Sequence, residues 1–403
     1  MKKTKSILVF NVGSSSIKFG LYTYRSDETS ATNLLRGKLS DIGSKTHFTV
    51  ADPTGRLTTN EVVKIADQRS ALAYLSKWLR TDAVEFRPIA IGHRIVHGGL
   101  DHQVPIFVNQ ETSEQLYALS QLAPLHQNSG LNCMEFFREQ WPDMPQIACF
   151  DTAFHYSMPM QEKLFALPKY LSSEGVRRYG FHGLSYEHIS NILPAHLGDA
   201  AEKKIVVAHL GQGVSMCAMN ERRSIATSMS FTPLDGLPMA TRCGSIDPAV
   251  ILYLIREKNM AEAEISDLLH NRSGLLGLSG ISGDVRTLLA SKDPAAAQAI
   301  DFFVHHVCRE LGSMAACLGG LDALVFTGGI GENSSNIRAR ICNRAAWLGI
   351  QLDETANAAQ QKCISQSDSS ISVWSLPTDE EFVIAQHVAG LMSDNPAFDR
   401  ETS

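Results

Sequence analysis

The stretch Asn11-Val12-Gly13-Ser14-Ser15-Ser16-Ile17-Lys18 joins a short apolar run, Ile7–Phe10, to an alternating one, Ile17–Tyr24. This pattern predicts two strands connected by a tight turn. One glycine and three serines in the turn present backbone N–H groups and hydroxyls to a single point, an arrangement that suits phosphate oxygens. From these residues alone, a plain hairpin turn with a surface lysine is an equally good interpretation. The Gly-x-x-x-x-Gly-Lys-Ser/Thr pattern of a P-loop does not occur in the chain.

The same pattern returns in the second half of the chain, where Ile205–Ala208, Gly211-Gln212-Gly213 and Val214–Met219 form an apolar run, a turn and a second run. Two such hairpins suggest a chain built from two related halves. Strands and helices alternate around them, which predicts an α/β fold. The further strands expected are Ile89–Ile91, Gln146–Phe150, Ala323–Thr327 and Val373–Leu376, and the helices are Gln127–Gln140, Pro248–Lys258, Ala295–Leu318, Ile337–Trp347 and one from Asp379 onward.

Length, charge and cysteine content narrow the class of protein. A chain of 403 residues is expected to form more than one domain. A net charge of −6 without a basic block argues against binding to nucleic acid or anionic lipid. No apolar run is long enough to span a membrane, and the run after the basic start is too short for a secretory signal. Eight scattered cysteines without a Cys-x-x-Cys pair indicate reduced thiols and a cytoplasmic location.

Three further glycine clusters could contact a nucleotide: His209–Gly213, Ser282–Arg286 and Thr327–Asn333. The last follows an apolar strand and precedes a helix, so phosphates or a ribose could sit at that turn. It lacks the third small residue of a Gly-x-Gly-x-x-Gly fingerprint, which argues against a Rossmann dinucleotide site.

Polar segments within apolar surroundings supply the candidate chemical groups. They are Gly92–Gly99, Pro124–Asn128, Cys149–His155, Gly180–Gly183 and Thr241–Pro248. A single histidine in such a segment is more often structural than catalytic. We therefore interpret His93, His97, His155 and His188 as structural.

Taken together and in order, these motifs resemble those of the acetate kinases, a family of short-chain carboxylate kinases within the actin-like ATPase and sugar kinase superfamily. Residues 11–18 are similar to the first family signature, and Ser228–Pro248 to the second. Phe326–Ser334 and Pro377–Glu381 also match, so the resemblance runs from residue 7 to about residue 390. The sequence departs from the family pattern at Gln212, Ala240, Cys243 and Ser245.

The resemblance implies an α/β fold of two duplicated actin-like, ribonuclease H-like domains with an interdomain active-site cleft. The first domain would span 1–152 and be completed by the C-terminal helix 384–403. The second, which binds the nucleotide, would span 153–383. The two glycine-turn hairpins would then be the two phosphate loops. The resemblance also implies a homodimer.

The implied reaction is reversible transfer of the ATP γ-phosphoryl group to acetate, giving acetyl phosphate and ADP, with Mg²⁺ or, as an alternative, Mn²⁺. The resemblance places Arg94 at the acetate carboxylate and Arg242 and His182 at the transferring phosphoryl group, with His126 assisting. Acetate is already ionised at pH 7 and needs no general base. We therefore expect Asp151 to orient Arg242 or a metal-bound water.

The remaining implied site residues fall into three groups. The metal ligands are Asn11 and Glu380. The apolar wall around the acetate methyl group consists of Val96, Leu125, Phe181 and Pro233. The ATP-binding residues are Ser14, Ser16, Lys18, His209, Leu210, Gly211, Gln212, Gly213, Asp284, Val285, Arg286, Gly329, Ile330, Gly331, Glu332 and Asn333.

Other functions remain open from the sequence. A propionate or butyrate kinase of the same family would share nearly every motif, although Val96 favours the smaller acetate. A sugar kinase would need a catalytic base and a polar sugar pocket. A nucleotide-operated binding module, such as actin, would leave the Arg94 and Val96 region without a role. ATP hydrolysis without acetyl phosphate formation would indicate that last class.

Overall fold

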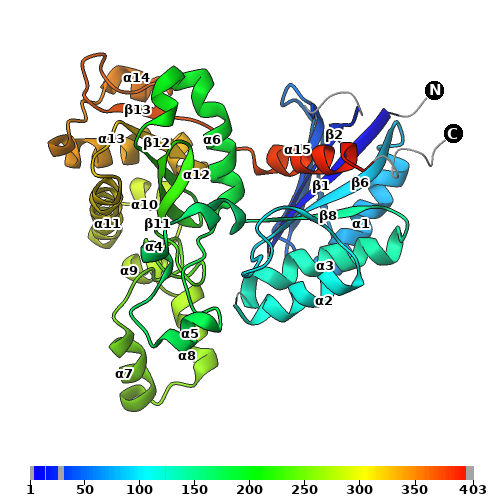
Figure 1. Ribbon diagram of the computed structural model, residues 1–403, viewed down its shortest axis with the longest axis horizontal. Coiled ribbons are helices and arrows are strands. Elements are labelled where there is room, and N and C mark those ends of the chain that lie inside the picture. The colour runs from blue at the N-terminus through cyan, green and yellow to red at the C-terminus, as the bar shows by residue number, and fades with distance from the viewer. Residues whose placement is uncertain (1–3, 14, 26–30, 123, 396–403) are drawn as a thin grey trace. The chain divides into compact units, whose positions relative to one another are not determined.

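The computed structural model describes residues 4–13, 15–25, 31–122 and 124–395. Contacts within the chain divide it into two compact units. Unit 1 contains residues 1–153 and 379–403, and unit 2 contains residues 154–378. Both combine a mixed sheet with helices, so the α/β class expected from the sequence is confirmed (Figure 1). Among the described residues, no helix combines the length and the apolar character needed to cross a membrane.

Unit 1 is built on an eight-stranded sheet with the strand order β5-β4-β3-β2-β1-β6-β8-β7. Strands β1 and β6 run parallel, as do β6 and β8, so their carboxyl ends lie at one edge of the sheet. The register pairs Phe10 with His93 and Arg94 with Cys149. Asn11, Arg94 and Asp151 therefore reach the same edge. The strands are β1 (Thr4–Val12), β2 (Ser16–Thr23), β3 (Asn33–Ser40), β4 (Thr46–Ala51), β5 (Leu57–Val63), β6 (Phe86–Ile95), β7 (Ile106–Phe107) and β8 (Gln146–Phe150).

Helices cover both faces of this sheet because β1 directs apolar side chains to both faces. Phe10 stacks on Phe137 of α3, with ring centroids 4.6 Å apart. On the other face, α15 packs closely because Gly92 has no side chain. A Cβ atom there would lie 2.5 Å from Ile384 and 2.8 Å from Val388. The helices are α1 (Gln68–Thr81), α2 (Gln110–Ala118), α3 (Pro124–Gln140) and α15 (Glu380–Ser393), with the 3-10 turn η1 (Leu119–Leu122).

Unit 2 contains a five-stranded sheet with the order β11-β10-β9-β12-β13. Strands β9 and β12 are parallel, with His209 opposite Thr327. The turn after β9 and the turn after β12 therefore lie side by side. The strands are β9 (Ile205–Leu210), β10 (Val214–Asn220), β11 (Arg223–Thr227), β12 (Ala323–Thr327) and β13 (Ser372–Ser375).

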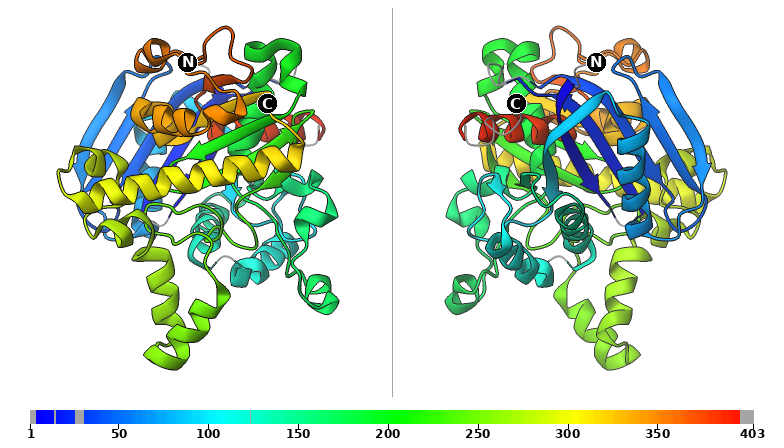
Figure 2. Two further views of the ribbon diagram at one scale, coloured as in Figure 1. Left: turned by 90° about the vertical axis from the view of Figure 1, so that its left-hand side faces the viewer. Right: turned by 90° about the vertical axis from the view of Figure 1, so that its right-hand side faces the viewer.

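Helices again cover the sheet of unit 2. The long helix α11, yellow in Figure 2, crosses the strands and contacts β9, β10 and β11. The apolar side chains Tyr186, Ile189 and Leu193 of α6 pack with Ile205 and Val207 in a buried core. The helices are α4 (Met160–Lys163), α5 (Lys169–Ser173), α6 (Gly183–Leu197), α7 (Pro248–Lys258), α8 (Glu262–Asn271), α9 (Gly274–Ser279), α10 (Val285–Ala290), α11 (Pro294–Leu318), α12 (Gly328–Asn333), α13 (Ser335–Arg344) and α14 (Glu354–Ala358), with the 3-10 turns η2 (Ala153–Ser157), η3 (Gly198–Glu202) and η4 (Ala346–Leu348).

The starts of α7 and α11 show why the sequence predicted them well. Asp247 and Asp293 cap the two helices by accepting hydrogen bonds from the backbone N–H groups of Ala249 and Ala295. A proline follows each aspartate at the first helical position, where its missing N–H costs nothing. Both helices end at a residue in the left-handed conformation, Asn259 and Gly319.

Candidate active site

In unit 1, Arg94 and Asp151 form a tight ion pair at the carboxyl ends of β6 and β8. The Nε atom of Arg94 donates to both Asp151 oxygens, at 3.0 and 3.1 Å, and Nη2 donates to Oδ2 at 2.5 Å. The Asp151 side chain is 1% exposed and the Arg94 side chain 21%. Burial by itself would lower the pKa of Arg94, but Asp151 and Glu380 raise it above its usual value. The guanidinium therefore stays charged in a largely dry site.

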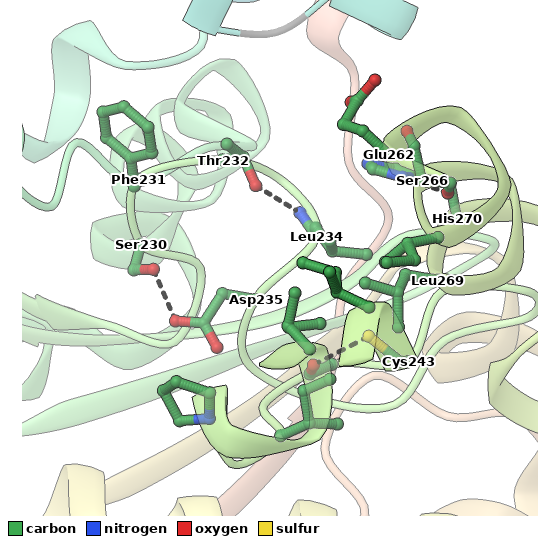
Figure 3. A pocket seen from close by; sticks show the side chains of 16 residues that line it. Ser230, Phe231, Thr232, Leu234, Asp235, Cys243, Glu262, Ser266, Leu269 and His270 are labelled. Carbon is green, nitrogen blue, oxygen red and sulfur yellow. Dashed lines mark hydrogen bonds between the residues drawn. The ribbon is translucent and has the colours of Figure 1, made fainter. Parts of the chain in front are cut away.

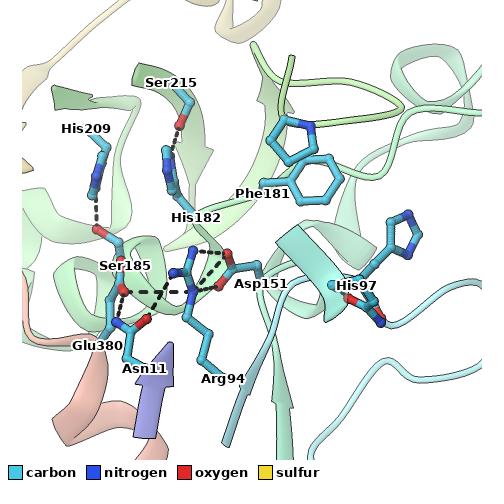
Figure 4. A network of polar contacts seen from close by, with 12 residues as sticks. Asn11, Arg94, His97, Asp151, Phe181, His182, Ser185, His209, Ser215 and Glu380 are labelled. Carbon is cyan, nitrogen blue, oxygen red and sulfur yellow. Dashed lines mark hydrogen bonds and ion pairs between the residues drawn. The ribbon is translucent and has the colours of Figure 1, made fainter. Parts of the chain in front are cut away.

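Asn11 connects this pair to Glu380 at the start of α15 (Figure 4) and to the neighbouring Glu381. Its side-chain oxygen accepts a hydrogen bond from Arg94 Nη1 at 3.0 Å. Its amide nitrogen donates to Glu380 Oε2 at 2.8 Å and to Glu381 Oε1 at 3.0 Å. Glu381 is not among the site residues expected from the sequence, although its place directly after Glu380 could have suggested it.

The position of these two glutamates follows from the way α15 begins. Asp379 caps the helix by accepting a hydrogen bond from Phe382 N, and it also forms an ion pair with Arg36 of β3. Glu380 and Glu381 occupy the first helical turn, where the helix dipole favours negative charge. The cap therefore holds both carboxylates against Asn11.

The other predicted residues of unit 1 are distributed as follows. Lys18 pairs with Asn11 across β1 and β2, and Val96 is buried just after β6. In the turn, Gly13 N donates to Ser16 O at 2.8 Å. Ser14 and the side chains of Leu125 and His126 lie outside the described part of the structure.

In unit 2, His182 occupies the position before α6 with a φ of 59°, in the left-handed region that non-glycine residues seldom adopt. Its Nδ1 atom lies 2.8 Å from Ser215 Oγ, and its ring stacks on His209 with centroids 4.2 Å apart. His209 Nδ1 in turn lies 2.8 Å from Ser185 Oγ. Such backbone strain is often found at functional sites.

His182 and Arg242 approach the same point beside the turn that follows β9. A Cβ atom at Gly213 would lie 3.0 Å from His182 Nε2 and 3.1 Å from Arg242 Nη2. The other terminal nitrogen of the Arg242 guanidinium, Nη1, donates a hydrogen bond to Pro233 O at 2.7 Å, and this bond holds the side chain in place. The second glycine of the turn thus makes room for both side chains.

A pocket of about 380 Å³ brings together the three glycine clusters of unit 2. Eight residues expected at the nucleotide line it, together with Gly283 and Ser334, which were not expected there from the sequence. The eight are Gly211, Gln212, Asp284, Val285, Arg286, Gly329, Ile330 and Asn333. His209, Leu210, Gly213, Gly331 and Glu332 lie on the same segments without lining this pocket.

Several side-chain contacts fix the segments that form the pocket. Asp284 caps α10 and pairs with Arg286, whose Nη2 lies 2.8 Å from Asp284 Oδ2. Glu332 accepts a hydrogen bond from Gly328 N at 3.0 Å. The buried Arg338 of α13, which was not expected at the site from the sequence, donates to the carbonyl oxygens of Gly331 and Glu332, both at 2.8 Å. These contacts fix the turn after β12.

A second pocket of about 500 Å³ in unit 2 is lined by residues of α7, of α8 and of the segment 230–246, most of them apolar. Although it is larger, it lacks the glycine turns, with their backbone N–H groups, that suit phosphates. The smaller pocket is therefore the better candidate for a nucleotide.

Several known proteins with similar sequences or structures are acetate or propionate kinases. The family model of the acetokinase family matches residues 6–386. An acetate kinase of Rhodopseudomonas palustris is 52% identical over 386 residues, covering 95% of this chain and 97% of that protein. An acetate kinase of Nitrobacter hamburgensis is 45% identical, covering 96% of each chain.

Two solved structures have the same fold. A propionate kinase from Francisella tularensis matches with a TM-score of 0.87 at 35% identity, covering 95% of this chain and 98% of that one. The acetate kinase of Porphyromonas gingivalis matches with a TM-score of 0.83 at 31% identity, covering 96% and 100%. Because the family model and these relatives cover nearly the whole chain, the chain belongs to the acetokinase family.

Proposed function

We propose that the residues described above carry out an acetate kinase reaction, in which the γ-phosphoryl group of ATP moves to a carboxylate oxygen of acetate. The products are acetyl phosphate and ADP. The enzyme class, a phosphotransferase with a carboxyl group as acceptor, follows from membership of the acetokinase family and from 52% identity to a curated acetate kinase. The finer assignments below are supported by the geometry of each unit.

The observation that carries the proposal is the partly buried Arg94, whose guanidinium is hydrogen-bonded to both oxygens of the buried Asp151. A carboxylate nucleophile has no proton to lose, but its charge repels the phosphoryl oxygens. A guanidinium can bind a carboxylate through two parallel hydrogen bonds and offset that repulsion. Asp151 occupies the Nε side of Arg94 and fixes the plane of the fork. We propose that Arg94 binds the substrate carboxylate and that Asp151 orients Arg94. The expectation that Asp151 orients Arg242 or a metal-bound water stays a prediction.

His182 and Arg242 are proposed to stabilise charge on the transferring phosphoryl group. Both side chains approach the glycine turn of residues 211–213, and Ser215 and Pro233 fix their far ends. Donors that are already oriented toward developing charge lower the barrier without reorganisation. The adjacent pocket is proposed to hold the nucleotide. The turn of residues 13–16 and Lys18 are proposed to contact phosphates as well.

The residues around Asn11 fit a magnesium ion. Two carboxylates, Glu380 and Glu381, share the amide of Asn11, which gives a small set of oxygen donors of the kind that magnesium prefers. One or two carboxylates suffice, since magnesium usually keeps several waters and binds substrate phosphates. A bound magnesium ion would neutralise charge on the β- and γ-phosphate oxygens. The oxygen of Asn11 already accepts a hydrogen bond from Arg94, so we assign the carboxylates the larger part in holding the ion. Mn²⁺ has the same preference for oxygen ligands.

Acetate is the preferred substrate in this proposal. The curated relatives with 44–52% identity are acetate kinases, while the propionate kinase structure is 35% identical. The buried Val96 would limit the space next to the acetate methyl group. Propionate remains the second candidate, because that propionate kinase has the same fold over nearly the whole chain.

A coupled assay of acyl phosphate formation tests these assignments. The purified chain is supplied with ATP, Mg²⁺ and acetate, propionate, butyrate or glycerol in parallel. We expect the highest kcat/KM with acetate, a lower value with propionate and none with glycerol. A higher kcat/KM for propionate would overturn the substrate assignment, and ATP hydrolysis without any acyl phosphate would overturn the proposed roles of the site residues.

We also propose that the protein is a homodimer and that α7 lies in its interface. Every residue of α7 is partly or fully exposed, although the helix carries a row of apolar side chains. Val250, Leu252, Tyr253 and Ile255 are each 42–49% exposed. An exposed apolar surface of this kind is typical of a protein contact. Light scattering should give a dimer for the wild type and a monomer for Ile255→Asp, and a monomeric wild type would refute the proposal. The cytoplasmic location stays a prediction from the sequence.

A further inference from the structure

The segment that carries Arg242 has no regular structure of its own. Residues 230–245, which we name the arginine loop, connect the region after β11 to α7 and form neither helix nor strand. Arg242 donates to Pro233 O of the same loop at 2.7 Å. That bond fixes the guanidinium relative to the loop, so the position of the cation depends on what holds the loop in shape.

The carboxylate of Asp235 connects the two ends of the arginine loop. Ser230 Oγ donates to Asp235 Oδ2, and Ser245 Oγ donates to Asp235 Oδ1 at 2.5 Å. Figure 3 shows the Ser230 hydroxyl directed at the Asp235 carboxylate. The Asp235 side chain thereby links Ser230, five positions earlier, to Ser245, ten positions later.

Backbone contacts carry this link toward Arg242. Ser245 N donates to Gly236 O at 2.8 Å, and Gly236 N donates to Ser245 Oγ at 3.2 Å. Gly244 has a φ of +71°, and a Cβ atom there would lie 2.6 Å from Gly236 O. The chain after Asp235 and the chain after Arg242 are thus in direct contact. A shift of residues 235 and 236 would displace residue 244, two positions from Arg242.

We infer that Asp235 is a positioning residue that holds Arg242 at the reacting phosphoryl group through the two serine hydrogen bonds. This inference rests on the proposed role of Arg242. Asp235 itself touches no substrate in this assignment. Its contribution is geometric, because a charged donor stabilises the transition state only when it is already in place, and a displacement of about 1 Å can cost about a hundredfold in rate.

The first test is a double-mutant cycle between Asp235 and Arg242. Asp235→Ala should lower kcat about 10- to 100-fold while the KM values for ATP and acetate stay within about twofold. In an Arg242→Ala background, Asp235→Ala should have little further effect, because the group that it positions is gone. If the decrease in kcat of the double variant equalled the product of the decreases in the two single variants, the inference would be wrong. A raised KM for ATP with an unchanged kcat would also overturn it.

Conservative variants separate positioning from a general loss of structure. Asparagine at residue 235 can accept from one serine and donate to the other, so Asp235→Asn should retain kcat within about threefold of wild type. If Asp235→Ala fails to fold, Ser230→Ala and Ser245→Ala each remove one hydrogen bond to Asp235 and should lower kcat by an intermediate factor. Ser245→Ala also removes the hydrogen bond from Gly236 N, so its loss should be the larger of the two. An Asp235→Asn protein that folds but is as slow as Asp235→Ala would refute the role of the two serine hydrogen bonds. So would unchanged kcat in both serine variants.

Asp293→Ala is the matched control. Asp293 is another aspartate of unit 2 whose carboxylate accepts a hydrogen bond, but from the backbone N–H of Ala295 at the start of α11 and outside the arginine loop. Its removal should leave kcat unchanged, and a loss equal to that of Asp235→Ala would point to a general structural effect. The single variants also distinguish the proposed role of Arg242 from that of Asp235. If Arg242→Ala kept wild-type turnover, the proposed role of Arg242 and this inference would both fail. If Arg242→Ala were slow and Asp235→Ala normal, this inference alone would fail.

Discussion

Asp151 binds Arg94 through both carboxylate oxygens, and three N–H···O contacts of 2.5 to 3.1 Å join the two side chains. The pair forms because β6 and β8 are parallel neighbours in a register that places Arg94 opposite Cys149. A carboxylate bound in this way fixes the plane and the charge of the guanidinium. It need not take a proton from a substrate that is already an anion.

Asp151→Asn should therefore impair the enzyme without removing a limb of its pH profile. Loss of one partner of a buried charge pair costs about 2–5 kcal/mol, which corresponds to a fall of about 30- to several thousandfold in kcat/KM for acetate. Initial rates against acetate concentration and pH give the comparison, with the exposed Asp143→Asn as the control. If one pH limb disappeared while the KM for acetate stayed normal, Asp151 would act as a general base.

Glu380→Gln should raise the Mg²⁺ concentration needed for half-maximal turnover, by about 10- to 100-fold. A neutral amide attracts the cation less than a carboxylate, and it also changes the hydrogen bond with Asn11. Turnover measured against Mg²⁺ at saturating ATP gives the shift. Glu139→Gln, which removes a surface partner of Arg69, is the control. A Mg²⁺ dependence equal to that of the wild type would refute the metal assignment.

Gly213→Ala should lower kcat about tenfold or more and leave the free energy of unfolding almost unchanged. The added methyl group would lie 3.0 Å from His182 Nε2 and 3.1 Å from Arg242 Nη2, so one of these groups must move. Gly390→Ala is a suitable control because its Cβ meets no atom within 4 Å. That helix variant should keep full activity and be more stable by about 0.5–1 kcal/mol. Normal turnover in Gly213→Ala would show that the two side chains tolerate displacement.

Val96→Ala should shift the ratio of kcat/KM values from acetate toward propionate by about 1–3 kcal/mol, the value of one methylene group in an apolar pocket. Val96 is buried and lies two residues after Arg94. Parallel kinetics with both acids measure the ratio, and the exposed Val84→Ala is the control. A ratio that did not change would place the methyl group elsewhere.

His155 should make the protein less stable as the pH falls from 7 to 5. Burial lowers the pKa of His155 to about 4, although its hydrogen bond to Phe181 O acts in the opposite direction. Between about pH 6.5 and 4 the unfolded chain therefore binds more protons than the folded one, and stability is lost as pH decreases. The loss amounts to about 1–2 kcal/mol at pH 5. Urea unfolding of wild type and His155→Gln at both pH values tests this, and an equal decrease in both would exclude His155 as a cause.

Local sequence was sufficient for much of the fold. The strand Ala323–Thr327 and the helix Pro248–Lys258 were predicted with the bounds that the structure shows. The hairpin around residues 11–18 was also predicted, although β1 extends three residues before and two residues after the expected run, and β2 begins and ends one residue earlier than expected. The signals for these elements are runs of apolar residues and the Asp-Pro pairs that begin helices. Each signal involves residues that are close together in the chain, so a single sequence is enough to recognise it.

The contacts within the candidate site could not be predicted in the same way. Arg94 and Asp151 are 57 positions apart and Asn11 and Glu380 are 369 apart. The parallel register of β6 with β8 brings the first pair together, and packing of α15 on Gly92 brings the second. The left-handed backbone of His182 and the tie from Asp235 to Ser245 likewise depend on neighbours that surround them in three dimensions. Residue types and motif order determined which groups could take part, but the register of the strands and the close approach of backbones decided which of them meet. Those contacts depend on packing energies between segments that no local pattern contains.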